Sequence, residues 1–489
     1  MIHPLIKISV GLILFFPWGS EAVTDLKEVD GKVSFVTLSA INNYESKINA
    51  HPFLNSSLPQ PQGYTGEFFE LNHDYPTQLD PVTESYPWQK VTNVGQITTN
   101  NALDYVLALK AYVTKDMRAL INNPNMPNSK DWYQSIWLGT EREPIHGVYV
   151  GSGFPAGTLT GQDIDITTYV YTLYNKRAAK TLGDIWGRTL ESALAPTISD
   201  STTQYGEGSV IVKFAFVTAC GSDWSPMSGT SSWQIYAPIN ASNGTAKSEK
   251  SECNSTQGNG SSTEPVLTNV YLMQFDIIVK DSVAAPDTGW VFSTLVYDKT
   301  APGNDTWDKM VPLGATWGGD TGIVNVKPEA LIPPVTVNES LEQNWINLKA
   351  PEYSRSTLGW DGRLSGPNDG AVVTPAWTAD RYYHQGLASA GCLGCHSSAQ
   401  YPMTSFLLPT TTYPPQTKQA PLSSDNSTNS LVLYVPGSDG WMRWFQSNNG
   451  LTPMGPNDNA GGKPVALDYD MVTAFKAIPM WRAAIAASE

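Results

Sequence analysis

One run of nine residues sets the architecture of this chain: Tyr271-Leu272-Met273-Gln274-Phe275-Asp276-Ile277-Ile278-Val279. The polar residues Gln274 and Asp276 fall at alternate positions among apolar ones, which is the pattern of a β-strand with one buried face. The run belongs to a longer β-rich segment, residues 266–280, which turn-forming residues flank. We therefore expect a long strand here, with one face in the core.

Four further segments have the composition of strands and are separated by Gly, Pro, Asn and Asp. They are Ser209–Thr218, Trp233–Ala237, Trp290–Asp298 and Lys309–Trp317. Several short strands at this spacing predict an antiparallel β-sandwich-like domain. The frequent Gly (40), Pro (35) and Trp (16) of the 489-residue chain suit a turn-rich β architecture better than a helical bundle. The expected fold class is α+β, mainly β, with a few helices.

Two helices are expected in the first part of the chain. Apolar residues recur at helical spacing over residues 102–121, and the pattern stops before Asn122-Asn123-Pro124. A second helix is predicted over residues 172–194. We interpret both as packing faces against the strands.

A proline-rich segment separates two parts of the chain. Ile332-Pro333-Pro334-Val335 is typical of a linker between elements. Residues 23–335 are expected to form the β-rich domain with its two helices, and residues 345–489 a loop-rich C-terminal region. One more helix is predicted over about residues 468–487, with Pro479 as a break or kink.

The C-terminal region contains the pentapeptide Cys392-Leu393-Gly394-Cys395-His396. Two thiols separated by two residues can each add to a vinyl group of haem, and the following histidine is then held beneath the iron. Cys392 and Cys395 are therefore expected to be the covalent anchors and His396 the axial ligand of the iron. With four Cys and six His in the chain, this pattern is not expected by chance.

Three other interpretations of the pentapeptide compete with haem. A thioredoxin-like pair of thiols needs a preceding strand, but the residues before Cys392 are Ala388-Ser389-Ala390-Gly391. A zinc site would need a fourth ligand, which His384 could supply beside Cys392, Cys395 and His396. A disulfide within the motif is the third alternative. The order of the two cysteines and the histidine favours haem.

On these residues the C-terminal region resembles a monohaem c-type cytochrome. The resemblance implies one covalently attached haem c and a methionine some tens of residues after the motif as the sixth ligand of the iron. Met454 is the first candidate, because the Pro- and Gly-flanked loop Thr452-Pro453-Met454-Gly455 could present its thioether. The other candidates are Met403, Met442, Met471 and His384.

An aromatic group lies shortly before Met454. Trp441, Trp444 and Phe445 could wall the haem or could form an ordinary core cluster. Arg443 could pair with a haem propionate or lie in water at the surface. The sequence leaves these alternatives open.

The N-terminus is typical of a secretory signal. Lys7 precedes a mostly apolar run, residues 8–16, and Ser20-Glu21-Ala22 has the small-x-small pattern of a cleavage site. Residues 1–22 are therefore expected to be removed on export, which places the mature protein in the periplasm or outside the cell. Covalent haem attachment also takes place outside the bacterial cytoplasm. The protein would meet the membrane only if this segment were retained.

Export makes disulfides permissible. Cys220 follows the apolar run 210–217, and Cys253 lies in a Ser-, Asn- and Gly-rich stretch, residues 239–263. A bridge between Cys220 and Cys253 would tie this polar loop to the end of a strand and would stabilise the fold by about 3 kcal/mol. Two free thiols are the alternative.

Charge and motifs narrow the class of function. The formal net charge of −15 argues against binding to nucleic acid and to acidic membranes, and permits attraction to a basic partner. The sequence contains no Walker loop, GxSxG or HExxH motif. We therefore expect an exported electron-transfer protein, in preference to a catalyst, that passes single electrons through one haem to a redox partner protein. The alternatives are a haem enzyme or gas sensor with an exchangeable sixth ligand, and a β-sandwich ligand-binding protein with a structural haem.

Overall fold

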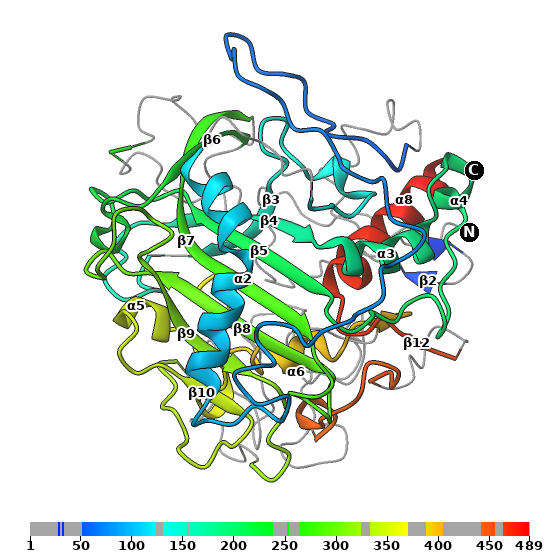
Figure 1. Ribbon diagram of the computed structural model, residues 1–489. Coiled ribbons are helices and arrows are strands. Elements are labelled where there is room, and N and C mark those ends of the chain that lie inside the picture. The colour runs from blue at the N-terminus through cyan, green and yellow to red at the C-terminus, as the bar shows by residue number, and fades with distance from the viewer. Residues whose placement is uncertain are drawn as a thin grey trace, which may run out of the picture.

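The computed structural model describes residues 51–123, 131–154, 156–237, 252–253, 265–323, 333–369, 388–403, 442–454 and 463–488, and the backbone of residues 28–29 and 32–33. The expected signal segment, residues 1–22, lies outside the described residues. One large antiparallel sheet and several helices make up the described part of the chain (Figure 1). The α+β, mainly β class is therefore confirmed.

The large sheet has eight strands in the order β10-β9-β8-β7-β5-β4-β3, and β6 also pairs with β7. Their bounds are β3 Tyr149–Phe154, β4 Ile166–Tyr174, β5 Val210–Val217, β6 Ser232–Ala237, β7 Val266–Lys280, β8 Trp290–Tyr297, β9 Met310–Thr316 and β10 Asn344–Ile346. Tyr271 of β7 pairs with both Val217 of β5 and Ser232 of β6. The long β7 thus has β5 along one edge and β6 and β8 end to end along the other. Two-residue strands form the ribbons β1 (Glu28–Val29) with β2 (Lys32–Val33) and β11 (Gln400–Tyr401) with β12 (Val465–Ala466).

The five segments predicted as strands form β5, β6, β7, β8 and β9, and β7 has the predicted bounds. The apolar side chains from which these strands were predicted pack on both faces of the sheet, and every residue of β8 is buried. Helix α2 covers one face and the C-terminal region covers the other. The described residues contain no second large sheet.

Helix α2, Ala102–Asn122, crosses the sheet on one side (Figure 1) and lies where the apolar spacing predicts a helix. Trp307 links the helix to the sheet. Its indole N–H donates to the Thr114 hydroxyl at 3.0 Å, and its ring meets Phe275 edge-on at 5.0 Å between centroids. The buried side chains of α2 recur every three to four residues, as in an amphipathic helix: Ala102, Tyr105, Val106, Leu109, Val113, Met117, Leu120 and Ile121.

The single helix predicted over residues 172–194 is wrong. Strand β4 takes up the first of these residues, and two helices follow, α3 Lys176–Trp186 and α4 Leu190–Leu194. Asn175 starts α3 because its backbone is extended and its side-chain oxygen accepts the N–H of Ala178 at 2.9 Å. Gly187, at φ 69°, ends α3, and Thr189 caps α4. Capping residues therefore divide a segment whose apolar pattern is continuous.

The remaining α-helices of the described residues belong to the C-terminal region: α5 Glu352–Arg355, α6 Cys392–His396 and α8 Ile478–Ser488. A π-helical stretch, Val472–Ala477, leads into α8, so the helix predicted over residues 468–487 begins at residue 472. Pro479 lies where the π geometry changes to α, since proline has no N–H to donate to the preceding turn. Within the described residues, no helix has the length and apolar character needed to cross a membrane.

The opposite face of the sheet carries a polar row beneath the C-terminal region. Lys213 of β5, Asp276 of β7 and Thr294 of β8 are paired in register, and Gln274 lies on the same face. Gln274, Asp276 and Thr294 are buried. The alternating polar residues of β7 are therefore hydrogen-bonded groups inside the protein and do not form a solvent-exposed face.

Contacts at several points hold the C-terminal region on the sheet. Asn344 of β10 pairs with Thr316 of β9, and Lys280 at the end of β7 binds Asp468 at 2.8 Å. Trp481 of α8 donates its indole N–H to the carbonyl oxygen of Leu194 at 3.0 Å. The region that carries the pentapeptide is thus packed directly against the strands.

Candidate functional site

The pentapeptide forms one short helix, α6. Helical residues i, i+3 and i+4 lie on one face, so Cys392, Cys395 and His396 share a face. These three residues are half-buried, whereas Leu393 and Gly394 between them are buried against the core. The helix therefore presents two thiols and an imidazole together on one side.

Gly391 fixes the start of α6. Its backbone, at φ 100° and ψ 171°, lies in a region that is almost exclusive to glycine. A Cβ atom at this position would lie 3.0 Å from the Cβ of Arg363. The next residue, Cys392, donates its N–H to the carbonyl oxygen of Leu364 at 2.8 Å. This close docking sets the direction in which the helix runs.

The imidazole of His396 is held by two residues. Nδ1 lies 2.8 Å from the backbone carbonyl oxygen of Tyr469, and the ring of Phe292 packs with 4.7 Å between centroids. Because a carbonyl oxygen only accepts, Nδ1 carries the proton and the lone pair is on Nε2. Burial lowers the pKa of His396 to about 4, so the ring is neutral near pH 7. A neutral ring with a free Nε2 is the form that binds a metal ion.

Both thiols of the motif are free. Burial raises the pKa of Cys395 to about 12 and that of Cys392 well above its usual value, and the charge of Asp369 adds to both shifts. A redox-active cysteine pair needs the opposite, a thiolate stabilised by a lowered pKa. The environment therefore disfavours a thioredoxin-like pair, and the thiols form no disulfide with each other.

The thiols and imidazole of the motif also do not converge as a zinc site would require. In the part of the chain that the structure describes, the group of three potential metal ligands that does converge is Cys220, Asp223 and Cys253. His384, the expected fourth zinc ligand, lies outside the described residues. The described geometry thus favours neither zinc nor a redox disulfide at the motif.

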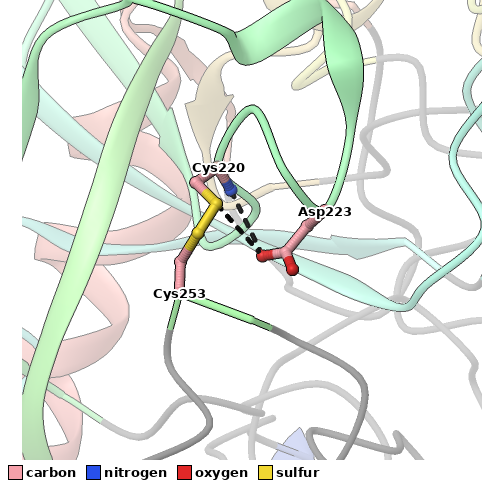
Figure 2. A group of neighbouring side chains, drawn as sticks. All are labelled: Cys220, Asp223 and Cys253. Carbon is pink, nitrogen blue, oxygen red and sulfur yellow. Dashed lines mark hydrogen bonds between the residues drawn. A yellow bond between two sulfur atoms is a disulfide. The ribbon is translucent and has the colours of Figure 1, made fainter.

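The converging group is a disulfide with a hydrogen-bonded neighbour (Figure 2). Cys220 and Cys253 are bonded to each other, with 6.2 Å between their Cα atoms, which confirms the predicted pair. Asp223 accepts the N–H of Cys220 at 3.4 Å and the N–H of Glu252 at 2.6 Å. Since both sulfur atoms are engaged in their mutual bond, the group is a covalent tie and not a metal site.

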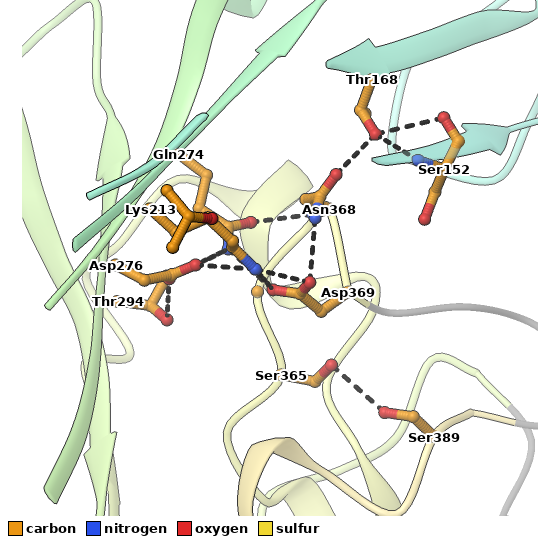
Figure 3. A network of polar contacts seen from close by, with 12 residues as sticks. Ser152, Thr168, Lys213, Gln274, Asp276, Thr294, Ser365, Asn368, Asp369 and Ser389 are labelled. Carbon is orange, nitrogen blue, oxygen red and sulfur yellow. Dashed lines mark hydrogen bonds and ion pairs between the residues drawn. The ribbon is translucent and has the colours of Figure 1, made fainter. Parts of the chain in front are cut away.

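A partly buried charged network occupies the polar row of the sheet, with the side chains of Lys213, Asp276 and Asp369 18%, 7% and 35% exposed (Figure 3). Lys213 Nζ lies 2.7 Å from a carboxylate oxygen of Asp369 and 3.0 Å from one of Asp276. Gln274 donates to Asp276 and to Asp369, each at 3.0 Å, and accepts the N–H of Asn368 at 2.8 Å. One ammonium group faces two carboxylates, so the ionised network carries a net negative charge.

The charges of this network act on the motif. After the larger effect of burial, Asp369 and Asp276 both raise the pKa of Cys392. Burial raises the pKa of Asp276. Burial is also the largest single effect on Asp369 and acts in the same direction, but the Lys213 ammonium and the hydrogen bonds from Lys213, Gln274 and Asn368 together outweigh it and keep the pKa of Asp369 below its usual value. Of the two carboxylates, Asp276 is therefore the one that takes up a proton more readily.

A small cavity of about 10 Å³, roughly the space that one water molecule needs, lies beside Cys392. Trp444, Phe445 and Arg363 form part of its wall. Arg363 is buried, donates to the carbonyl oxygen of Gly319 at 3.1 Å, and stacks over Phe445 at 4.7 Å from the ring centroid. The aromatic residues Trp444 and Phe445 thus lie next to the motif, and Arg363, which the sequence did not single out, is the arginine in this wall. Trp441 lies outside the described residues.

The described residues fit one side of a covalently bound haem, the side at which it would be attached. Two protonated thiols and an imidazole with a free Nε2 lone pair share one face, as attachment requires. The cavity beside Cys392, about 10 Å³, is far smaller than the roughly 300–1,000 Å³ of pockets that enclose a ligand. The described residues therefore build the attachment edge of a site and do not enclose a whole porphyrin.

The sixth ligand of the iron stays a prediction. Met454 is 4% exposed, but it is not among the residues that line the cavity beside the motif. Met471 is also buried, and its sulfur lies 3.9 Å from the hydroxyl of Ser398. Met403 and Met442 are half-buried. Burial alone suits either a ligand or a core methionine.

The residues that hold His396 were not apparent from the sequence. Tyr469 is 73 positions away from His396, and Phe292 belongs to a strand of the sheet, so no local pattern connects them. The available signal is the acidic pair Asp468 and Asp470 on either side of Tyr469. Acidic residues before a helix commonly cap it, but only the tertiary structure shows what the residue between them does.

Comparison of the chain with protein-family profiles, curated proteins and solved structures finds no match. Likeness to a known fold therefore contributes nothing to the functional argument. That argument depends on the chemistry and geometry of the residues described above.

Proposed function

We propose that this protein is an exported monohaem c-type cytochrome that transfers single electrons. Cys392 and Cys395 are its covalent anchors, and His396 is the axial ligand of the iron. One observation carries the proposal: the common face of α6 presents two free thiols together with an imidazole whose Nδ1 is bonded to Tyr469.

Each of these residues has a defined part in the proposed attachment. The Cys392 and Cys395 thiols would each hold the haem through a thioether bond, in which the sulfur bonds to one carbon of a vinyl group and the thiol hydrogen passes to the other. The hydrogen bond from Nδ1 to the Tyr469 carbonyl oxygen increases the electron density at Nε2, the atom that would face the iron. Bound haem would supply a one-electron couple between ferric and ferrous iron.

The partly buried network next to the motif would help to set the potential of this couple. Lys213, Asp276 and Asp369 together carry a net negative charge. Negative charge in an interior of low dielectric constant favours the oxidised, more positive state and so lowers the reduction potential. Met454 as the sixth ligand would act in the opposite direction and would close the iron to small molecules.

Location and partner follow from features outside the motif. The disulfide between Cys220 and Cys253 suits an oxidising compartment, as does a removable signal over residues 1–22. The net charge of −15 favours a redox partner with a basic surface. We therefore place the protein in the periplasm or outside the cell.

Absorption spectra of the reduced protein with and without carbon monoxide test the electron-transfer assignment. The purified wild type should be coloured, and carbon monoxide should leave its spectrum unchanged because Met454 occupies the sixth position. Met454→Ala should bind carbon monoxide, whereas the control Met403→Ala should not. Rapid binding by the wild type would instead indicate a haem enzyme or gas sensor, and a colourless protein would contradict the proposal altogether.

A further inference from the structure

We propose that Asp468 is a positioning residue that sets the orientation and tautomer of His396 through the carbonyl group of Tyr469. The inference rests on the proposed role of His396 as the ligand of the iron. The large sheet would then have a specific role, because the groups that bind Asp468 belong to two of its strands and to the loop that precedes a third.

The carboxylate of Asp468 is enclosed and fully bonded. Asp468 is 1% exposed. Its Oδ1 accepts from Lys280 Nζ at 2.8 Å and from the indole N–H of Trp290 at 2.7 Å, and its Oδ2 accepts the backbone N–H of Tyr205 at 2.8 Å. Lys280 ends β7, Trp290 begins β8, and Tyr205 precedes β5. One carboxylate thus ties the C-terminal region to two strands of the sheet and to the loop before a third.

The backbone at Asp468 and Tyr469 is strained. Their φ angles are 44° and 69°, and residues other than glycine rarely occupy this left-handed region. Such a conformation persists only where the surrounding contacts impose it. Besides the carboxylate of Asp468, the Tyr469 hydroxyl donates to the carbonyl oxygen of Asn448 at 2.6 Å, and the Tyr205 hydroxyl donates to Asp470 at 2.6 Å. These bonds hold the backbone turn at residues 468 and 469, here called the corner, in place on both sides.

The strained corner aims the carbonyl oxygen of Tyr469 at His396. If the backbone of residues 468 and 469 relaxed to negative φ, this carbonyl group would turn, and its 2.8 Å contact with Nδ1 would be lost. Either ring nitrogen could then carry the proton. Phe292 would still pack on the ring but would not select a tautomer. The orientation of Nε2 therefore depends on the anchor at Asp468.

The ion pair that anchors the corner adds no net charge near the ring. Lys280 and Asp468 have side chains that are 11% and 0% exposed, and their charges cancel. Removing the carboxylate alone leaves a buried, unpaired ammonium group. A weaker bond at Nδ1 makes His396 a poorer electron donor, and an unpaired cation disfavours ferric iron. Both effects move the reduction potential to more positive values.

Two replacements of Asp468 test the inference. Asp468→Asn keeps the shape and one oxygen acceptor but removes the charge, and Lys280→Met with Asp468→Leu removes both charges so that no ion is left unpaired. The reduction potential should become more positive in both proteins, and more so in Asp468→Asn. In the full chain purified without haem, ¹⁵N shifts of the His396 ring should show Nδ1–H in the wild type and a mixture of tautomers in both variants.

Asp281→Asn is the matched control. Asp281 is equally buried and directly follows Lys280, but its carboxylate accepts from Trp88 at 3.0 Å and from Tyr105 of α2 at 2.7 Å. This control should lower stability without changing the potential or the tautomer. An unchanged tautomer in both Asp468 variants, or an equal change in the control, would overturn the inference. A wild type without haem would contradict the proposed function alone, because the tautomer is measured in the haem-free chain.

Discussion

Two histidines of this protein, half-buried His396 and buried His146, have contrasting surroundings. His396 has its Nδ1 bonded to Tyr469, whereas His146 has no hydrogen-bond partner for either ring nitrogen in the described structure. The ring of His146 stacks on Trp233, with 4.4 Å between centroids, and burial lowers its pKa to about 3. A bonded ring has a defined tautomer and a lone pair aimed in one direction. The unbonded ring of His146 acts as a flat apolar group and costs stability.

The variant His146→Phe should therefore be more stable than the wild type. At pH 7 we expect its free energy of unfolding to be about 1–3 kcal/mol higher, because a buried polar group without partners is removed. The folded-state pKa of His146, about 3, lies below its unfolded value of about 6.5. The wild type thus loses stability as the pH falls below 6.5, since only the unfolded chain takes up a proton there. The advantage of the variant should grow by about 2 kcal/mol between pH 7 and pH 5.

Urea unfolding at both pH values measures this difference. Buried Glu143, whose pKa burial raises to about 7, is present in both proteins and drops out of the comparison. His73→Phe is the control, because His73 also stacks on an aromatic ring, Phe53, but is only half-buried. A destabilised His146→Phe protein, or one with the pH dependence of the wild type, would show that His146 has a partner in solution.

Among the elements, five strands and helix α2 were predicted close to their observed bounds, whereas β3, β4 and β10 were not predicted as strands. β7 has its predicted bounds because β-branched and aromatic residues recur along its whole length and turn-forming residues flank it. Residues 172–194 were predicted as one helix because the apolar pattern continues through the caps at Asn175 and Thr189. Helix ends depend on single residues that bond to the backbone, and an apolar pattern does not report them.

The helix that carries the motif depends on one glycine at its start. Gly391→Ala should destabilise the protein by about 1–3 kcal/mol, because the backbone at φ 100° is almost exclusive to glycine and the new Cβ would crowd Arg363. The docking of α6 through the N–H of Cys392 should weaken with it, and less haem should be attached per chain. Urea unfolding and haem content per chain are the two measurements.

Gly161→Ala separates backbone strain from crowding. Gly161 also has a positive φ, 72°, but a Cβ atom there would meet nothing within 4 Å. We expect this control to lose about 1 kcal/mol of stability and to keep its full haem content. Equal losses of haem in the two variants would contradict the specific role of Gly391.

In the whole molecule, a large sheet supports one short helix. β5 and β7 supply the buried charges of Lys213 and Asp276, β8 supplies Phe292 against the imidazole, and Lys280 and Trp290 bind the corner that precedes α8. The three residues of the attachment motif could be predicted because they are adjacent in sequence. Their supports could not, because strand register and long-range packing decide which distant side chains meet.

This arrangement also explains why the polar residues of β7 were easy to find and hard to interpret. Gln274 and Asp276 stand out in the sequence as breaks in an apolar run. Their partners Asn368 and Asp369 are more than ninety positions away, in the C-terminal region that covers the sheet. A polar alternation predicts a strand, but it does not tell whether water or another part of the chain faces the polar side.

The intact mass of the mature protein, purified from the periplasm of a bacterium that attaches haem c, tests the central claim most directly. We predict the mass of the processed polypeptide plus one haem, carried by the peptide that contains Cys392, Cys395 and His396. The added mass should disappear in the variant Cys392→Ala with Cys395→Ala and persist in Cys220→Ser with Cys253→Ser. A wild-type mass equal to that of the bare polypeptide, with the motif thiols unmodified, would contradict the account.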